Sequence, residues 1–271
     1  RLRAGRSFCF RTPSGRSPSA AELARIRALA IPPAYVDVWI CCDPRGHLQA
    51  TGRDARGRKQ YRYHPGFRRR RDAGKFARML EFARALPRLR RGVRADLKRP
   101  GLPRRKVLAL VVVLLGGTLL RVGNDEYAQH NGSFGLTTLR DRHVQRVGKQ
   151  LQLQFRGKSG RAQAVAIDDL RLSRLVQRCR ALPGQALFQY RDRRGQVRAI
   201  DSGMVNAYLR ELGGAEFSAK DFRTWGGTLA ALAEFGATPR PDGVRAQARA
   251  EREAICRVAA QLGNTPAVCR A

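Results

Sequence analysis

The sequence predicts an α+β protein in which a small antiparallel β-rich domain precedes a larger, mainly helical domain. Residues 35–64 contain three runs of strand-forming residues joined by two short turn sequences. From Gly74 onward, apolar residues recur mostly at helical spacing. The chain has 271 residues, of which 43% are hydrophobic, and this is enough for two cores. We therefore expect one domain over residues 1–73 and a second over 74–271, with a small β-hairpin inside the helical part.

The N-terminal elements follow from local signals. Residues 1–17 form a basic arm with little pattern. Ser19 and Glu22 have capping-box spacing and predict a short helix, which Pro32 and Pro33 end. Each connection between the expected strands has a glycine at its fourth position, which is typical of a tight turn. The expected strands are Tyr35–Cys42, His47–Arg53 and Lys59–His64.

The second domain begins with amphipathic helical sequence. We expect the prolines to break the basic stretch Pro87–Lys106. The apolar run Val107–Leu120 predicts a buried helix, because it is too short and too glycine-interrupted to cross a membrane. Alternating residues around GKSG predict a β-hairpin with Lys158 at its tip. The later helices are expected at Asp168–Arg180, Ser202–Leu212, Ser218–Phe235 and Asp242–Leu262.

The end of the last long helix carries its own signals. Gly263 and Asn264 are typical of a helix C-cap, and Thr265 and Pro266 of the start of another helix.

Charge narrows the class of partner. Lysine and arginine total 54 against 21 acidic residues, which gives a formal net charge of +33. Such a charge repels itself within a compact fold and is better accommodated beside a polyanion. The predominance of arginine suits forked recognition of phosphate. The sequence therefore predicts nucleic acid as the partner.

Three cations have sequence contexts unlike those of the other basic residues: Arg121 in LLRVGNDEYA, Lys158 in FRGKSG and Arg223 in KDFRTWGG. Two arginines and a lysine can together hold a phosphodiester and protonate its leaving oxygen. Asn264 in GNTPAVCRA is a fourth candidate.

Several other kinds of site are disfavoured. The six cysteines include no CxxC pair and no zinc spacing. GKS is not a nucleotide-binding loop, because Gln152 stands where the first glycine is needed. The adjacent acids Asp168–Asp169 and Asp125–Glu126 are typical of helix N-termini and do not form a magnesium cluster. We expect no metal, no cofactor, no nucleotide and no membrane partner.

Six motifs together resemble one family. They are ATGRDARGRKQYRYHP (50–65), RVGNDEYA (121–128), GLTTLRDRHV (135–144), FRGKSG (155–160), KDFRTWGGT (220–228) and GNTPAVCRA (263–271). In this order they are similar to the bacterial (deinococcal-like), poxvirus-type type IB DNA topoisomerases, and the resemblance covers nearly the whole chain from about Ile31. It implies the tyrosine recombinase/type IB topoisomerase type of fold. The implied activity relaxes supercoils of both signs through a transient 3′-phosphotyrosine, without ATP or metal.

The resemblance also implies residue roles. Arg121 and Arg223 would hold the non-bridging oxygens of the scissile phosphate, and Lys158 would protonate the departing 5′ oxygen. Asn264, in a position that the family fills with histidine or asparagine, would donate to the same phosphate, or would only cap its helix. Lys220 matches the position of a catalytic histidine or lysine in related recombinases, or contacts DNA.

The remaining candidates would bind DNA. In the strand Arg58–Tyr63, alternate residues point to opposite faces, so basic, amide and phenol groups together suit a major groove. The alternative is a half-exposed strand with tyrosines in the core. Asn124 and Tyr127 match family positions near the cut. The full DNA-binding set is Arg53, Arg58, Lys59, Gln60, Tyr61, Tyr63, Asn124, Tyr127 and Lys220.

The resemblance places the family's nucleophilic tyrosine nine residues beyond the Asn264 position, which is two residues past Ala271, so none of the six tyrosines present is expected to take that role. We expect a cytoplasmic, nucleoid-associated monomer that clamps duplex DNA. Two alternatives remain, a tyrosine recombinase and a non-enzymatic duplex DNA-binding protein.

Overall fold

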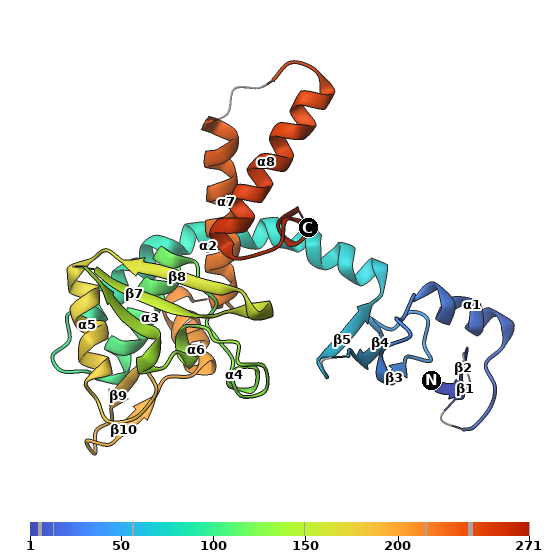
Figure 1. Ribbon diagram of the computed structural model, residues 1–271, viewed down its shortest axis with the longest axis horizontal. Helices are drawn as coiled ribbons and strands as arrows, with labels where there is room; N and C mark the ends of the chain where they lie inside the picture. The colour runs from blue at the N-terminus through green and yellow to red at the C-terminus, as the bar shows by residue number, and fades with distance from the viewer. Residues whose placement is uncertain are drawn as a thin grey trace. The chain divides into compact units, whose positions relative to one another are not determined.

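The computed structural model describes residues 1–4, 7–12, 14–55, 57–148, 150–214, 216–237 and 241–270. The chain divides into two compact units, Arg1–Arg78 and Met79–Ala271, drawn in Figure 1. Each unit combines helices with small antiparallel sheets, so the predicted α+β class is confirmed.

The N-terminal unit starts with two short paired strands, β1 (Leu2–Ala4) and β2 (Ser7–Cys9), where the sequence suggested an arm without pattern. Helix α1 (Ala20–Ala28) has the predicted capping box. The Ser19 hydroxyl accepts from the Glu22 amide at 3.3 Å, and the Glu22 carboxylate accepts from the Ser19 amide at 2.6 Å.

The predicted meander is present as one antiparallel sheet in the order β3-β4-β5. Its strands are β3 (Val36–Ile40), β4 (Leu48–Arg53) and β5 (Lys59–Tyr63). The second turn is closed by the Gly57 amide, which donates to the Asp54 carbonyl at 2.8 Å. One face of β4 is covered, since Ala50 is 1% exposed, and the other face carries Arg53 in solvent.

Helix α2 (Pro65–Leu97) corrects two expectations, because it begins before Gly74 and runs through Pro87 without ending. Proline inside a helix costs about 3 kcal/mol. Here Pro87 lies on the exposed side, while Phe82, Leu86 and Leu89 are buried on the opposite side. Burying each such side chain contributes roughly 1.5–3 kcal/mol, which outweighs the cost of the proline.

The core of the C-terminal unit is built around α3 (Arg104–Thr118), whose residues from Val107 to Val112 are all buried. A helix that is apolar all round must be surrounded, and α3 packs against α5, α6 and α7 (Figure 1). The other helices are α4 (Asp125–Asn131), α5 (Leu170–Arg180), α6 (Ser202–Gly213), α7 (Ala219–Ala237), α8 (Val244–Leu262) and α9 (Pro266–Arg270).

A three-stranded sheet lies beside these helices. Its strands are β6 (Val144–Val147), β7 (Gln150–Arg156) and β8 (Ala162–Ile167). Strands β7 and β8 form the predicted hairpin, and β6 extends it. Leu151, Leu153 and Phe155 alternate into the core. A second hairpin, β9 (Gln189–Arg191) and β10 (Val197–Ala199), was not predicted.

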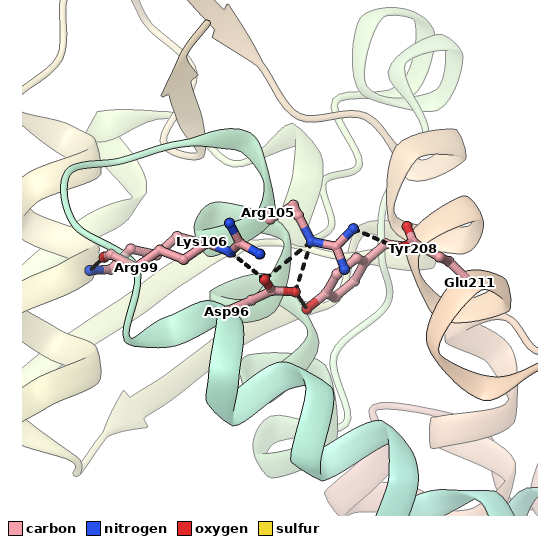
Figure 2. A network of polar contacts seen from close by, with 6 residues as sticks. All are labelled: Asp96, Arg99, Arg105, Lys106, Tyr208 and Glu211. Carbon is pink, nitrogen blue, oxygen red and sulfur yellow. Dashed lines mark hydrogen bonds and ion pairs between the residues drawn. The ribbon is translucent and has the colours of Figure 1, made fainter. Parts of the chain in front are cut away.

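A buried polar network ties α2, α3 and α6 together (Figure 2). The Asp96 carboxylate, on a residue only 3% exposed, accepts from Arg99 at 2.5 Å, from Arg105 at 3.1 Å and from the Tyr208 hydroxyl at 2.8 Å. Burial alone would raise the pKa of Asp96, but hydrogen bonds from Arg105, Arg99 and Tyr208 outweigh it and hold the pKa below its usual value. Arg105 also donates to Glu211 at 2.5 Å.

Among the described residues, the helices are all too short or too polar to cross a membrane.

Candidate active site

Arg121 is held by the backbone that follows α3. The helix ends at Leu119, which adopts the left-handed conformation with φ of 54°. The chain after it pairs with the segment before β6, because the Leu136 amide donates to the Arg121 carbonyl at 2.9 Å. Gly123 has φ of 106° and lies so close to this segment that an added Cβ would be 3.0 Å from the Thr138 hydroxyl. The backbone on both sides of Arg121 is therefore tightly constrained.

Arg223 reaches the same place from the first turns of α7. Its Nη1 donates to the Leu119 carbonyl, and its Nη2 donates to the Leu262 carbonyl at 2.7 Å. The guanidinium is thereby fixed to the ends of α3 and α8, two elements far apart in the sequence.

Asn264 follows the C-terminus of α8. The left-handed cap is Gly263, with φ of 58°, and the Asn264 amide donates back to the Ala259 carbonyl at 2.8 Å. Gly263, and not Asn264, is therefore the left-handed cap residue of α8, and the Asn264 side chain is available for other contacts. Its Oδ1 instead accepts from Arg121 Nη2 at 2.5 Å and from Arg223 Nη2 at 3.2 Å.

Two of these side chains, those of Arg121 and Arg223, converge on the side-chain oxygen of the third, Asn264. Two guanidinium groups that point at one oxygen form the arrangement that holds a non-bridging phosphate oxygen. The structure thus brings together three of the four predicted catalytic residues, from positions more than 140 residues apart in the extreme case.

The electrostatics of the cluster favour an anion. Burial, and then the nearby Arg121, lowers the pKa of Arg223 to about 10. Burial, followed by the charge of Arg161, lowers the pKa of Arg121. Arginine is effectively always protonated in proteins, so the cluster carries two positive charges. A bound phosphate would relieve the cost of keeping two partly buried cations side by side.

Lys158, the fourth residue, lies at the predicted place. It begins the single 3-10 turn η3 (Lys158–Gly160) between β7 and β8, and it is exposed. The loop is closed by the Gly157 amide, which donates to the Arg161 carbonyl at 2.8 Å. Arg161 Nη1 then donates to the Asn264 carbonyl at 2.6 Å, so the base of the Lys158 loop touches the cluster.

The tyrosines of the C-terminal unit do not enter this cluster. The Tyr208 hydroxyl donates to Asp96 (Figure 2), and burial, followed by this hydrogen bond, raises the pKa of Tyr208. Tyr190 is 6% exposed within the core. Tyr127 is exposed on α4. The expectation that the nucleophile lies beyond Ala271 stays a prediction.

The N-terminal candidates separate onto two faces of the β3-β4-β5 sheet. Tyr61 pairs with Thr51, which in turn pairs with Trp39, so the three lie in one row across the sheet. Trp39 is 51% and Tyr61 49% exposed. Lys59 and Arg53 form the next row on the same face, where Arg53 is ion-paired with Asp37 at 3.5 Å.

Tyr63 stacks between Tyr61 and Phe67, with ring centroids 6.1 Å and 5.5 Å away. Arg58 and Gln60 bind the Asp54 carboxylate at 2.7 Å and 2.9 Å, which holds both side chains beside the turn and away from the row of Tyr61.

The other candidates lie at helix starts. The Asn124 side chain caps α4, since its Oδ1 accepts from the Tyr127 amide at 3.1 Å. Lys220 is exposed in the first turn of α7, one turn before Arg223. Their DNA contacts stay predictions.

Sequence reasoning missed residues that these contacts single out. Arg161 and Gln163 link the hairpin to the turn at Asn264, and Trp39 and Thr51 extend the row of Tyr61. An open groove beside the hairpin is lined by Phe134 with Arg140, Arg142 and Arg156 among others. In a chain with 54 basic residues, no local signal separates these arginines from the rest. Trp39 could have been found from its place on a strand beside the tyrosines.

Among the described residues, no three or more His, Cys, Asp or Glu side chains gather closely enough to hold a metal ion.

Comparison with known proteins gives matches over both units. The catalytic-core model of eukaryotic DNA topoisomerase I matches residues 64–271, and the N-terminal domain model of bacterial DNA topoisomerase IB matches residues 7–54. DNA topoisomerase 1B of Acanthamoeba polyphaga mimivirus is 34% identical over 212 residues, which are 77% of this chain and 63% of the viral protein. The chain thus spans less than two thirds of that relative.

A solved XerH site-specific recombinase, bound to its difH substrate, superposes with a TM-score of 0.42 at 14% identity. The superposed region covers 68% of this chain and 48% of the recombinase chain. The family assignment rests on the sequence matches, of which the catalytic-core match covers more than half of the chain. With both its catalytic region and its N-terminal region matched in sequence, the chain belongs to the type IB DNA topoisomerase family.

Proposed function

We propose that the complete protein relaxes positive and negative supercoils of duplex DNA by cutting one strand, letting it rotate and resealing it. The observation that carries this proposal is the convergence of Arg121 and Arg223 on the side-chain oxygen of Asn264. A non-bridging oxygen of a scissile phosphate is the natural occupant of that position. Membership of the family supports the same activity.

The chemistry follows from these positions. A tyrosine, expected beyond Ala271, attacks phosphorus as its phenol proton passes to solvent, and a P–O bond to tyrosine forms while the P–O5′ bond breaks. Arg121, Arg223 and Asn264 stabilise the charge that grows on the non-bridging oxygens. Lys158 gives its proton to O5′, so the leaving strand ends in a hydroxyl. The reverse reaction, with O5′ attacking the 3′-phosphotyrosine, restores the strand.

This cycle needs no fuel and no divalent cation. The phosphotyrosine conserves the energy of the phosphodiester bond, and the torque in the DNA drives rotation in either direction. The two guanidinium groups provide the charge neutralisation that a metal ion would otherwise supply.

The N-terminal unit serves in this proposal as a DNA-binding domain. Its row of Trp39, Thr51 and Tyr61, in which the two aromatic residues are exposed, lies next to Arg53 and Lys59 and combines apolar, hydroxyl and cationic groups suited to base edges and phosphates.

A relaxation assay on the full-length protein tests the proposal. Both positively and negatively supercoiled plasmid should be relaxed in excess EDTA without ATP. Loss of all activity on chelation contradicts it.

A second assay separates this enzyme from a protein that only coats DNA. Lys158→Ala should abolish relaxation but leave the affinity for duplex DNA within a few-fold of wild type, because one exposed lysine contributes little to binding. Strand exchange between two DNA sites by a tetramer would instead favour the recombinase.

A further inference from the structure

Arg161 makes a contact that nothing in its sequence context predicts. Its Nη1 donates to the Asn264 backbone carbonyl at 2.6 Å, across a separation of 103 residues. The contact joins the loop that carries Lys158 to the turn between α8 and α9. A hydrogen bond from a charged donor is stronger than one between neutral groups, so this contact can bias the position of a short loop.

A second contact joins the same two segments. The Gln163 side chain packs against both Gly157, before Lys158, and Gly263, before Asn264. A Cβ added to Gly263 would lie 2.7 Å from Gln163 Nε2, and one added to Gly157 would lie 3.1 Å from Gln163 Cγ. The absence of side chains at both glycines lets the hairpin and the end of α8 close on Gln163.

The loop between these contacts is short and closed. The Gly157 amide donates to the Arg161 carbonyl at 2.8 Å, which leaves Lys158 within a turn whose two ends are hydrogen-bonded. A rotation or shift of Arg161 therefore moves the base of the turn that carries Lys158.

The type of acceptor also matters. Because Arg161 binds a backbone carbonyl rather than a carboxylate, its partner brings no negative charge that would offset its own. That charge lies close enough to Arg121 to help lower the pKa of Arg121. Docking the hairpin thus adds a cation beside the phosphate-binding cluster.

We propose that Arg161 is a positioning residue that docks the Lys158 hairpin onto the Asn264 turn, and so places the general acid relative to the phosphate-binding cluster. This rests on the proposed function of the same site. A general acid must lie within hydrogen-bond reach of the leaving oxygen, and a misplacement of about 1 Å costs on the order of 100-fold in rate. In the proposal, Arg161 acts on DNA cleavage through Lys158.

The test measures single-turnover cleavage by the full-length protein on two duplex substrates. One has the natural bridging 5′ oxygen at the cut, and the other has sulfur there, which leaves as a thiolate without needing a proton. Arg161→Ala should slow cleavage of the oxygen substrate by roughly 10- to 100-fold. The sulfur substrate should bring its rate back to within a few-fold of wild type, as it should for Lys158→Ala.

Controls separate this role from a loss of folding or of charge. Arg198→Ala removes an exposed arginine of β10, ion-paired with Asp192 at 2.8 Å, and should cleave both substrates at the wild-type rate. The double variant Arg161→Ala/Lys158→Ala should be no slower on the oxygen substrate than Lys158→Ala alone, because the two residues act in one step. Gln163→Ala removes the second contact and should also cleave the sulfur substrate faster than the oxygen substrate. This variant tests the inference even if Arg161→Ala fails to fold.

Three outcomes overturn the inference: equal slowing of Arg161→Ala on both substrates, no slowing on either, or additive loss in the double variant. Failure of the proposed function looks different. In that case wild type cleaves neither substrate, or the sulfur substrate does not rescue Lys158→Ala.

Discussion

Asn264 presents its side-chain oxygen to Arg121 Nη2 at 2.5 Å, and Arg223 donates to that same oxygen at 3.2 Å. An amide oxygen therefore occupies the place that our proposal gives to a phosphate oxygen. When DNA binds, the amide must turn so that its NH₂ group, not its oxygen, faces the phosphate.

We expect substitutions of Asn264 to separate stability from cleavage. Asn264→Asp places a carboxylate against two guanidinium groups and should raise the melting temperature by a few degrees, about 1 kcal/mol. The same carboxylate excludes the phosphate, so cleavage should fall at least tenfold further than in Asn264→Ala. The alanine variant loses one donor to a charged group, roughly a tenfold effect. Thermal unfolding and single-turnover cleavage measure both, and an aspartate variant as active as wild type would falsify this placement of the phosphate.

Gly226 is predicted to be irreplaceable because Leu119 packs directly against it. A Cβ added there would lie 2.3 Å from Leu119 Cδ2. Gly226→Ala should cost about 1–3 kcal/mol of stability through overpacking. It should also reduce cleavage, since the Leu119 carbonyl holds Arg223. Gly236→Ala, on the same helix with nothing within 4 Å of its added Cβ, is the control and should be neutral or stabilising.

Asp96→Asn should destabilise the C-terminal unit by about 1.5–3 kcal/mol, because it replaces the buried, charged acceptor that binds Arg99, Arg105 and Tyr208 with a neutral amide. The pKa of Asp96 is lowered in the fold. Its contribution is thus complete above the unfolded value of roughly 4 and disappears as the pH falls through the folded value.

Urea unfolding as a function of pH measures this effect. The wild type should lose stability below about pH 4 more steeply than Asp96→Asn. Asp192→Asn, an ion-paired residue on the surface, should change stability by no more than about 0.5 kcal/mol. Parallel acid profiles for wild type and Asp96→Asn would argue against the network.

The 271-residue chain should bind duplex DNA without forming a covalent adduct. Its charge of +33 does not depend on a nucleophile. If it neutralises on the order of six to ten phosphates, its affinity should fall about 10³- to 10⁵-fold between 50 and 200 mM salt. Binding isotherms and a denaturing gel of the same mixtures measure both properties. A flat salt response or a covalent band from this chain contradicts the prediction.

Trp39 should report DNA binding by the N-terminal unit. The chain has two tryptophans, and a Trp225→Phe variant leaves Trp39 as the only one. Duplex DNA should then quench and shift the emission of Trp39, because its exposed ring would be covered. Tyr61→Ala should weaken the quenching titration without changing the melting temperature. An unchanged spectrum at saturating DNA would remove this face from the interface.

Much of the fold could be predicted from local pattern, since helices and strands with one buried face repeat their apolar residues at the matching period. The meander β3-β4-β5 and the Lys158 hairpin are confirmed for this reason. Helix α2 was misjudged at Pro87, because the burial of Phe82, Leu86 and Leu89 outweighs a local rule. Strands β9 and β10 have three residues each, too few to show a period, and they form because partners are nearby.

Part of the candidate site could likewise be predicted from local sequence, and part could not. Arg121, Arg223 and Asn264 could be named from their motifs, and the structure brings them to one oxygen. The contact of Arg161 with the Asn264 carbonyl could not be predicted, because it depends on where two segments separated by 103 residues meet.

The anchoring of Arg223 has one more consequence. Its two partners, the carbonyls of Leu119 and Leu262, lie at the C-terminal ends of α3 and α8, where each helix dipole carries about half a negative charge. Two such ends attract the guanidinium and offset part of the cost of burying it. A carboxylate in their place would put an ionised group beside the phosphate and repel it. Helix ends hold the arginine without adding such a group.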